Sequence, residues 1–119
     1  MKKALFVVVI FALFGTTQSF SQVMVNDVNI NDLDIKYVRL LLENTTFGAK
    51  VQVNVDYGQK PKFMKAYRIT DANGEKKQFN SIVDILNFMY ANGWKYLNYT
   101  ETLLGGGKLK CVYLLEKKE

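Results

Sequence analysis

Four carboxylates that fall on predicted strands are the residues of this sequence best suited to acid–base chemistry. They are Glu43, Asp56, Glu101 and Glu116. Two carboxyl groups at a suitable separation can hydrolyse a glycosidic bond, so a small carboxylate-based hydrolase or an enzyme inhibitor is one alternative function. Carboxylates on the solvent face of a sheet give the same pattern, and a domain of this size has little room for a substrate cleft. The sequence therefore favours a surface role for them.

Other catalytic and metal-binding chemistry lacks the residues that it needs. The 119 residues include no histidine and a single cysteine, Cys111. This excludes Cys/His zinc sites, Ser-His-Asp and Cys-His catalysis, and an intrachain disulfide. Cys111 lies among apolar residues of its predicted strand, so we expect it to be a buried small hydrophobe. We expect no catalytic residue and no cofactor, and hence a protein that is not an enzyme.

Two loops resemble ligand-binding patterns but lack required positions. Asp27, Asn29 and Asn31 match positions 1, 3 and 5 of a calcium loop. Asp32 stands where that loop needs glycine, and Val38 stands where it needs glutamate. The glycine run before the last strand could cradle a phosphate only at the start of a helix, and here a strand follows. We therefore expect no metal site, and we interpret the glycine run as a hairpin tip.

The densest aromatic stretch begins at the end of the predicted helix. It contains Tyr90, Trp94, Tyr96 and Tyr99. Exposed aromatic rings stack on sugars or anchor protein contacts, whereas buried rings fill a core. The candidate binding residues are Tyr90, Tyr96 and Tyr99, in each case only if the ring is exposed. The alternative is that Trp94 and Tyr96 share the core and only Tyr90 or Tyr99 reaches the surface.

Hydrophobic periodicity predicts the elements that position these residues. Strict alternation over 47–57 indicates a strand with one core face and one solvent face, as in antiparallel sheets. An apolar stripe at helical spacing predicts one long helix over 81–92. The predicted order is β-β-β-β-α-β-β, with strands at 35–43, 47–57, 63–70, 75–79, 94–103 and 108–116. We expect an α+β domain in which the helix packs across a single antiparallel sheet of five or six strands.

The predicted core combines the helix stripe with the inward positions of the strands. Its expected members are Ile82, Ile85, Leu86, Met89, Trp94, Val51, Val53, Val55 and Leu115. The last strand is apolar on both faces, which predicts a central strand that the helix covers on one side.

The N-terminus has the three-part pattern of an export signal. A basic start at Met1–Lys3 precedes an unbroken apolar run of residues 4–14. At about 1.5 Å per residue, that run spans only about half of a ~30 Å bilayer core. Small residues at Ser19 and Ser21 then predict cleavage before Gln22.

This signal divides the chain into a signal peptide (1–21), a loose N-terminal lead-in (22–34) and a single α+β domain (35–119). The formal charge of +5 falls to +3 without Lys2 and Lys3. Acidic residues dilute the remaining cations, which therefore do not form the clustered footprint of a nucleic-acid-binding protein. We expect a mature chain in the periplasm or outside the cell, with no membrane span and no nucleic-acid partner.

The predicted helix and its end carry a motif of the form F-x-S … D-x-L-N-x-M … G-W. Its residues are Phe79, Ser81, Asp84, Leu86, Asn87, Met89, Gly93 and Trp94. Together with V-D-Y-G-Q at 55–59 and D-x-N-G at 71–74, this motif resembles small exported proteins of unknown function from Gram-negative bacteria, over roughly residues 35–116. The resemblance implies a fold and supplies no activity and no catalytic residues. We therefore predict an exported interaction module that binds a protein or glycan of the cell envelope.

Overall fold

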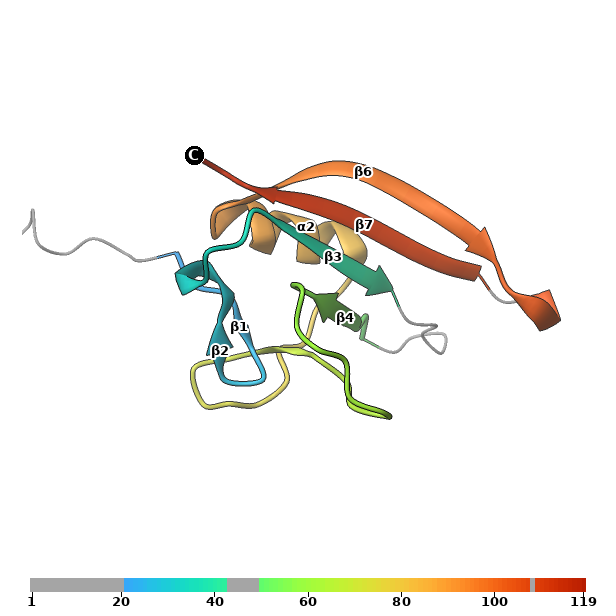
Figure 1. Cartoon of the computed structure of the whole chain (residues 1–119), viewed down its shortest axis with the longest axis horizontal. Coiled ribbons are helices and arrows are strands. Elements are labelled where there is room, and N and C mark those ends of the chain that lie inside the picture. Colours follow the sequence, from blue (N-terminus) through green and yellow to red (C-terminus); the bar gives the residue numbers. More distant parts are fainter. Residues whose placement is uncertain (1–20, 43–49, 108) are drawn as a thin grey trace, which may run out of the picture.

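The computed structural model describes residues 21–42, 50–107 and 109–119 (Figure 1). The predicted signal peptide up to residue 20, Glu43 and the first residues of the predicted strand 47–57 lie outside these ranges. The elements in chain order are β1 (Met24–Val25), β2 (Val28–Asn29), η1 (Ile30–Asp32), β3 (Tyr37–Leu42), β4 (Val53–Asp56), β5 (Ile69–Thr70), α2 (Ile82–Ala91), β6 (Trp94–Leu103), η2 (Gly105–Gly107) and β7 (Leu109–Lys117).

Within the described residues these elements form two antiparallel sheets and one α-helix, which confirms the predicted α+β class. The small sheet has the order β2-β1-β5, and the large sheet has the order β4-β3-β7-β6. The prediction that β7 is a central strand is correct, because β7 pairs with β3 on one side and β6 on the other. Figure 1 shows the long β6–β7 hairpin running past the end of α2.

The prediction of a single sheet of five or six strands is wrong, and so is the predicted strand order. The described part of the chain has seven strands in two sheets, with five strands before the helix. Two of these come from the predicted lead-in, while the predicted strand 75–79 makes only isolated bridges at Lys76 and Phe79. The predicted strand 63–70 shrinks to Ile69–Thr70, because residues 63–66 are exposed and offer no inward face.

The segment predicted as a loose lead-in is part of the core. Val23, Val25 and Ile30 are fully buried, and β1 pairs with both β2 and β5. The side chain of Asn31 holds this segment in place, since its Oδ1 accepts hydrogen bonds from the backbone N–H of Val23 and the indole N–H of Trp94, both at 3.1 Å. Three buried aliphatic side chains without regular spacing are enough to anchor two short strands.

Helix α2 begins and ends where the sequence predicts. Ser81 is the N-cap, and its Oγ accepts a hydrogen bond from the N–H of Asp84 at 3.2 Å. The Asp84 carboxylate in turn accepts from the N–H of Asn80 at 3.0 Å. The helix stops at Asn92, and Gly93 takes a φ of +95°, which favours glycine. Among the described residues, no helix has the length and apolar character needed to cross a membrane.

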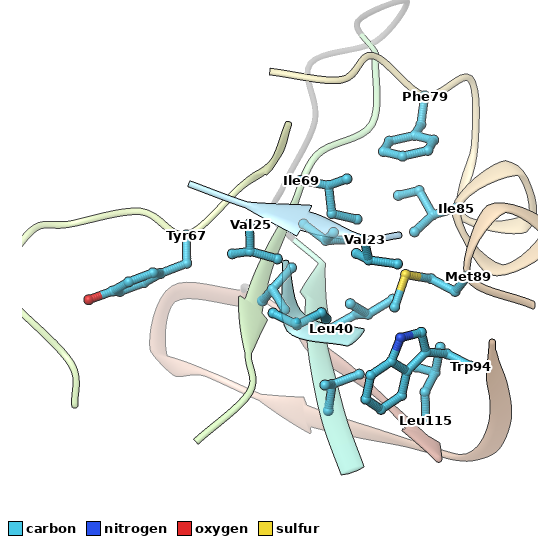
Figure 2. Packing of buried hydrophobic residues seen from close by; sticks show 14 residues of the cluster. Val23, Val25, Leu40, Tyr67, Ile69, Phe79, Ile85, Met89, Trp94 and Leu115 are labelled. Atoms are coloured by element: carbon cyan, nitrogen blue, oxygen red, sulfur yellow. The ribbon is translucent and has the colours of Figure 1, made fainter. Parts of the chain in front are cut away.

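The core lies where α2, the large sheet and the small sheet meet (Figure 2). Of the nine predicted core residues, six are buried: Ile85, Met89, Trp94, Val53, Val55 and Leu115. The other three, Ile82, Leu86 and Val51, are partly buried against this cluster. Figure 2 shows the Trp94 indole between Met89 and Leu115, so the residue that follows the helix stop joins α2 to the central strand.

Candidate interaction surface

The three predicted binding tyrosines are all exposed, and Trp94 is fully buried. The exposed fractions are 59% for Tyr90, 51% for Tyr96 and 38% for Tyr99. Tyr96 therefore does not share the core with Trp94, which the sequence had left as an alternative. All three therefore meet the condition set for a candidate binding residue, and their positions decide which of them share a surface.

A β-bulge brings two of these tyrosines to the same face of β6. Tyr96 and Tyr99 are three residues apart, so strict alternation would point them to opposite faces. The pairing instead shifts between Tyr96 and Asn98, where Leu97 has no partner across the strand. Tyr96 then lies opposite Leu115, and Tyr99 lies opposite Tyr113. Nothing in the residue types signals this bulge, so the shared face could not be read from the sequence.

The face that carries these tyrosines is the core face of the large sheet, continued beyond the core. Leu115 is buried at the inner end of β7, whereas Leu103 and Leu109 at the outer end are exposed. We call this continuation the hairpin surface; its residues are Tyr96, Tyr99, Glu101 and Leu103 of β6, with Leu109, Cys111 and Tyr113 of β7. It is an apolar and aromatic face that neither α2 nor the small sheet covers at its outer end.

The aromatic centre of the hairpin surface is a tyrosine pair with a cysteine beside it. The rings of Tyr99 and Tyr113 are 4.8 Å apart at their centroids, tilted by 41°. The Tyr99 hydroxyl donates to Cys111 Sγ at 3.4 Å, and this bond raises the pKa of Tyr99. Burial raises the pKa of Tyr113, with added effects of Cys111, Tyr96 and Glu101. Both phenols therefore stay neutral at neutral pH and present rings and hydroxyl donors rather than charge.

The prediction that Cys111 is buried in the core is wrong, and Tyr90 lies apart from the other two candidate tyrosines. Cys111 is only partly buried, because it lies on the hairpin surface rather than in the core. Tyr90 lies on α2 with the Lys118 ammonium 3.9 Å from its ring centroid. Lys118 follows the inner end of β7, so Tyr90 belongs to the base of the hairpin and Tyr99 to its outer half.

Among the described residues, the candidate carboxylates Asp56 and Glu116 share one face of the large sheet, and Glu101 lies on the other face. By strand register, Glu101 lies on the hairpin surface, whereas Asp56 lies on the opposite face of the large sheet. Partial burial of Asp56 would raise its pKa, but hydrogen bonds from Arg39 and the Gly58 N–H, with the charge of Arg39, outweigh it and hold the pKa below its usual value. Glu116 lies within salt-bridge distance of Lys36 and Lys95. A carboxyl with a lowered pKa is a poor general acid.

The two loops that resemble ligand-binding patterns have structural roles. Asn29 is the N-cap of η1, and its side chain accepts a hydrogen bond from the N–H of Asn31. The Asn31 side chain accepts from the N–H of Val23 and the indole N–H of Trp94. The described residues contain no cluster of three potential metal ligands. The glycine run forms the turn η2 at the hairpin tip, with Gly106 at φ +80°.

Comparisons with protein-family models, with curated proteins and with solved structures gave no match for this chain. The hairpin surface is therefore interpreted from its own geometry.

Proposed function

We propose that this chain is an exported, non-enzymatic interaction module whose hairpin surface binds a partner protein of the cell envelope. The observation that carries the proposal is the continuation of the sheet's core face, with Tyr99, Leu103 and Leu109 exposed, beyond the part that α2 covers. Contiguous apolar surface of this kind is typical of interaction sites, and tyrosine is enriched among residues that dominate binding energy.

A protein partner fits this surface better than a glycan. Glycan sites combine a flat aromatic platform with polar groups, whereas the outer end of the hairpin surface is formed by Leu103 and Leu109. In addition, β6 pairs only with β7 in the part of the chain that the structure describes, which leaves its other edge available for a strand of a partner. The hydrolase alternative has less support, because Glu101 lies on the face opposite Asp56 and Glu116, and these two carboxylates are each held in salt bridges with basic side chains.

The proposal is tested by affinity capture from envelope and secreted fractions of the source cells. Tyr99→Ser combined with Leu103→Ser should abolish recovery of the specific partner. The matched control is Thr100→Ala combined with Thr102→Ala, on the opposite face of the same strand. Equal recovery by both variants would remove the hairpin surface as the binding site. Binding to purified envelope glycans that Tyr99→Ser and Leu103→Ser abolish would replace the protein partner with a glycan.

Export is part of the proposal and has its own measurement. The signal pattern of residues 1–21 predicts that the protein recovered from cells begins at Gln22. Mass spectrometry of the intact protein should find that N-terminus, as glutamine or as its cyclised form. A recovered chain that still begins at Met1 would contradict export by this signal.

A further inference from the structure

The loop between β4 and β5 exposes the two most accessible large apolar side chains of the described residues. Phe63 is 94% exposed and Met64 is 88% exposed. They follow one another in the chain, and the loop that contains them projects from the body of the protein beside β4 (Figure 1). Single exposed apolar residues are ordinary, but two adjacent ones with nearly complete exposure require an explanation.

The backbone of the loop holds this pair outward. The N–H of Lys65 donates to the carbonyl of Lys62 at 3.2 Å, which closes a turn around Phe63 and Met64. Met64 has a φ of +60°, a conformation that residues other than glycine seldom adopt. The turn therefore presents both side chains at its tip.

The base of the loop is fixed to the sheet through Tyr67. The N–H of Tyr67 donates to Asn54 Oδ1 at 3.1 Å, and its carbonyl accepts from the N–H of Val55 at 2.8 Å. The Tyr67 hydroxyl donates to the carbonyl of Lys60 at 3.4 Å. Because Tyr67 is itself buried, the tip is mounted on the core through a short and well-anchored base.

The charged residues of the loop itself are all basic. Residues 57–70 contain Lys60, Lys62, Lys65 and Arg68 and no acidic residue. Of these, the ammonium groups of Lys60, Lys62 and Lys65 make no salt bridge within the described parts of the chain. Lys62 and Lys65 also line an open depression of about 520 Å³ beside the tip, in which the one carboxylate, Asp56, is paired with Arg39. Three lysines around an apolar tip combine the two features that a charged lipid surface recognises.

We infer that the 60–65 loop docks this protein on the surface of an anionic phospholipid bilayer. Phe63 and Met64 enter the boundary between headgroups and acyl chains, while the lysines lie at the level of the lipid phosphates. A soluble phosphate would use the lysines but would give Phe63 and Met64 no apolar environment. The pairing of apolar tip and cationic flanks therefore favours a bilayer over a free anion. This surface is separate from the hairpin surface and adds to the proposed function.

Residues 4–14 are apolar and would bind lipid on their own, so binding of the whole protein to vesicles does not test the loop. The experiment therefore measures the environment of the loop itself. Phe63→Trp introduces a fluorophore at the tip, and Val83→Trp on the exposed face of α2 is the matched control. With vesicles of equimolar phosphatidylcholine and phosphatidylglycerol, emission of the Phe63→Trp variant should shift to shorter wavelength and be quenched by brominated lipid. The Val83→Trp variant should show neither effect. Buried Trp94 contributes the same background to both.

Charge and composition provide the remaining tests. Phosphatidylcholine vesicles alone, or high salt, should weaken the response of the Phe63→Trp variant. Adding Lys62→Gln and Lys65→Gln should weaken partitioning by about tenfold or more. The inference is overturned by an unshifted tip fluorophore, by equal binding to neutral vesicles, or by an equal response to soluble glycerophosphate, which would identify a free-anion site. A tip that responds only to a soluble protein would identify a protein contact instead.

Discussion

At the scale of single residues, Asn31 joins the N-terminal segment to the end of the helix. Its Oδ1 accepts two hydrogen bonds, and its Nδ2 donates to the carbonyl of Asn92 at 2.7 Å. Asn92 is 61 residues away and Trp94 is 63 residues away. No local pattern can announce partners at such separations, so the sequence predicts only a loose segment rich in asparagine and aspartate at residues that in fact anchor the core.

Replacing Asn31 with alanine should destabilise the fold strongly. The substitution leaves the indole N–H of Trp94 and the N–H of Val23 without their acceptor, and an unsatisfied buried group costs about 1–3 kcal/mol. We expect the free energy of unfolding in urea to fall by about 2–4 kcal/mol. Asn98→Ala, at an exposed position of β6, should change it by less than about 0.5 kcal/mol. Similar small effects of both substitutions would contradict the role assigned to Asn31.

The ion pair of Asp56 and Arg39 makes stability depend on pH in a defined direction. The folded pKa of Asp56 lies below its ordinary unfolded value of about 3.9. Its stabilising contribution is therefore complete above that unfolded value and is lost as the pH falls through the folded pKa. Exposed pairs contribute about 0.2–1 kcal/mol, so the effect is small.

The measurement is the free energy of unfolding of the wild type and of Asp56→Asn, at neutral pH and at acid pH. The wild type should be the more stable at neutral pH, and the difference should vanish below the folded pKa. An advantage that persists in acid would show that Asp56 acts through contacts other than its charge.

At the scale of elements, the buried and the exposed face of α2 can be compared by the effect of alanine substitutions on stability. Met89 and Ile85 are fully buried, Leu86 is partly buried and Val83 is 60% exposed. Met89→Ala should lower the free energy of unfolding by about 2–5 kcal/mol because it leaves a cavity beside Trp94. Val83→Ala should change it by less than about 0.5 kcal/mol, and Leu86→Ala should fall between them. Thermal or urea unfolding measures all three, and equal losses would contradict the assigned orientation of the helix.

Elements were predictable where two local signals agree. The strand 94–103 is observed with the predicted bounds, since it starts after the helix stop at Gly93 and ends at the glycine turn. The predicted strand 63–70 rests on a single signal, a run of partly apolar residues. Its first half is observed as an exposed loop. The bulge at Leu97, which sets the face of Tyr99, depends on pairing with β7 and therefore has no local signal.

At the scale of the whole molecule, the two proposed surfaces lie toward opposite edges of the large sheet. The 60–65 loop is anchored on β4, and the hairpin surface lies on β6 and β7, in a sheet ordered β4-β3-β7-β6. The loop carries three lysines beside its apolar tip, and the outer hairpin carries exposed tyrosine and leucine side chains. A protein docked by its loop could thus present the hairpin to a partner at the membrane surface. The sequence identified the tyrosines of the hairpin but predicted a strand at residues 63–70, and the arrangement of the two surfaces depends on strand order, which has no local signal.

This arrangement predicts that the two surfaces act independently. Phe63→Ser with Met64→Ser should abolish binding to anionic vesicles and leave capture of the partner in solution unchanged. Tyr99→Ser with Leu103→Ser should have the reverse effect. Substitutions at distant sites without shared partners are additive, so the combination should lose both activities, and its change in stability should equal the sum of the changes in the two double variants. Vesicle flotation in the presence of the captured partner measures both activities at once. The wild type should float together with the partner, the loop variant should leave both proteins in solution, and the hairpin variant should float without the partner. Loss of partner capture by the loop variant in solution would show that the surfaces are coupled.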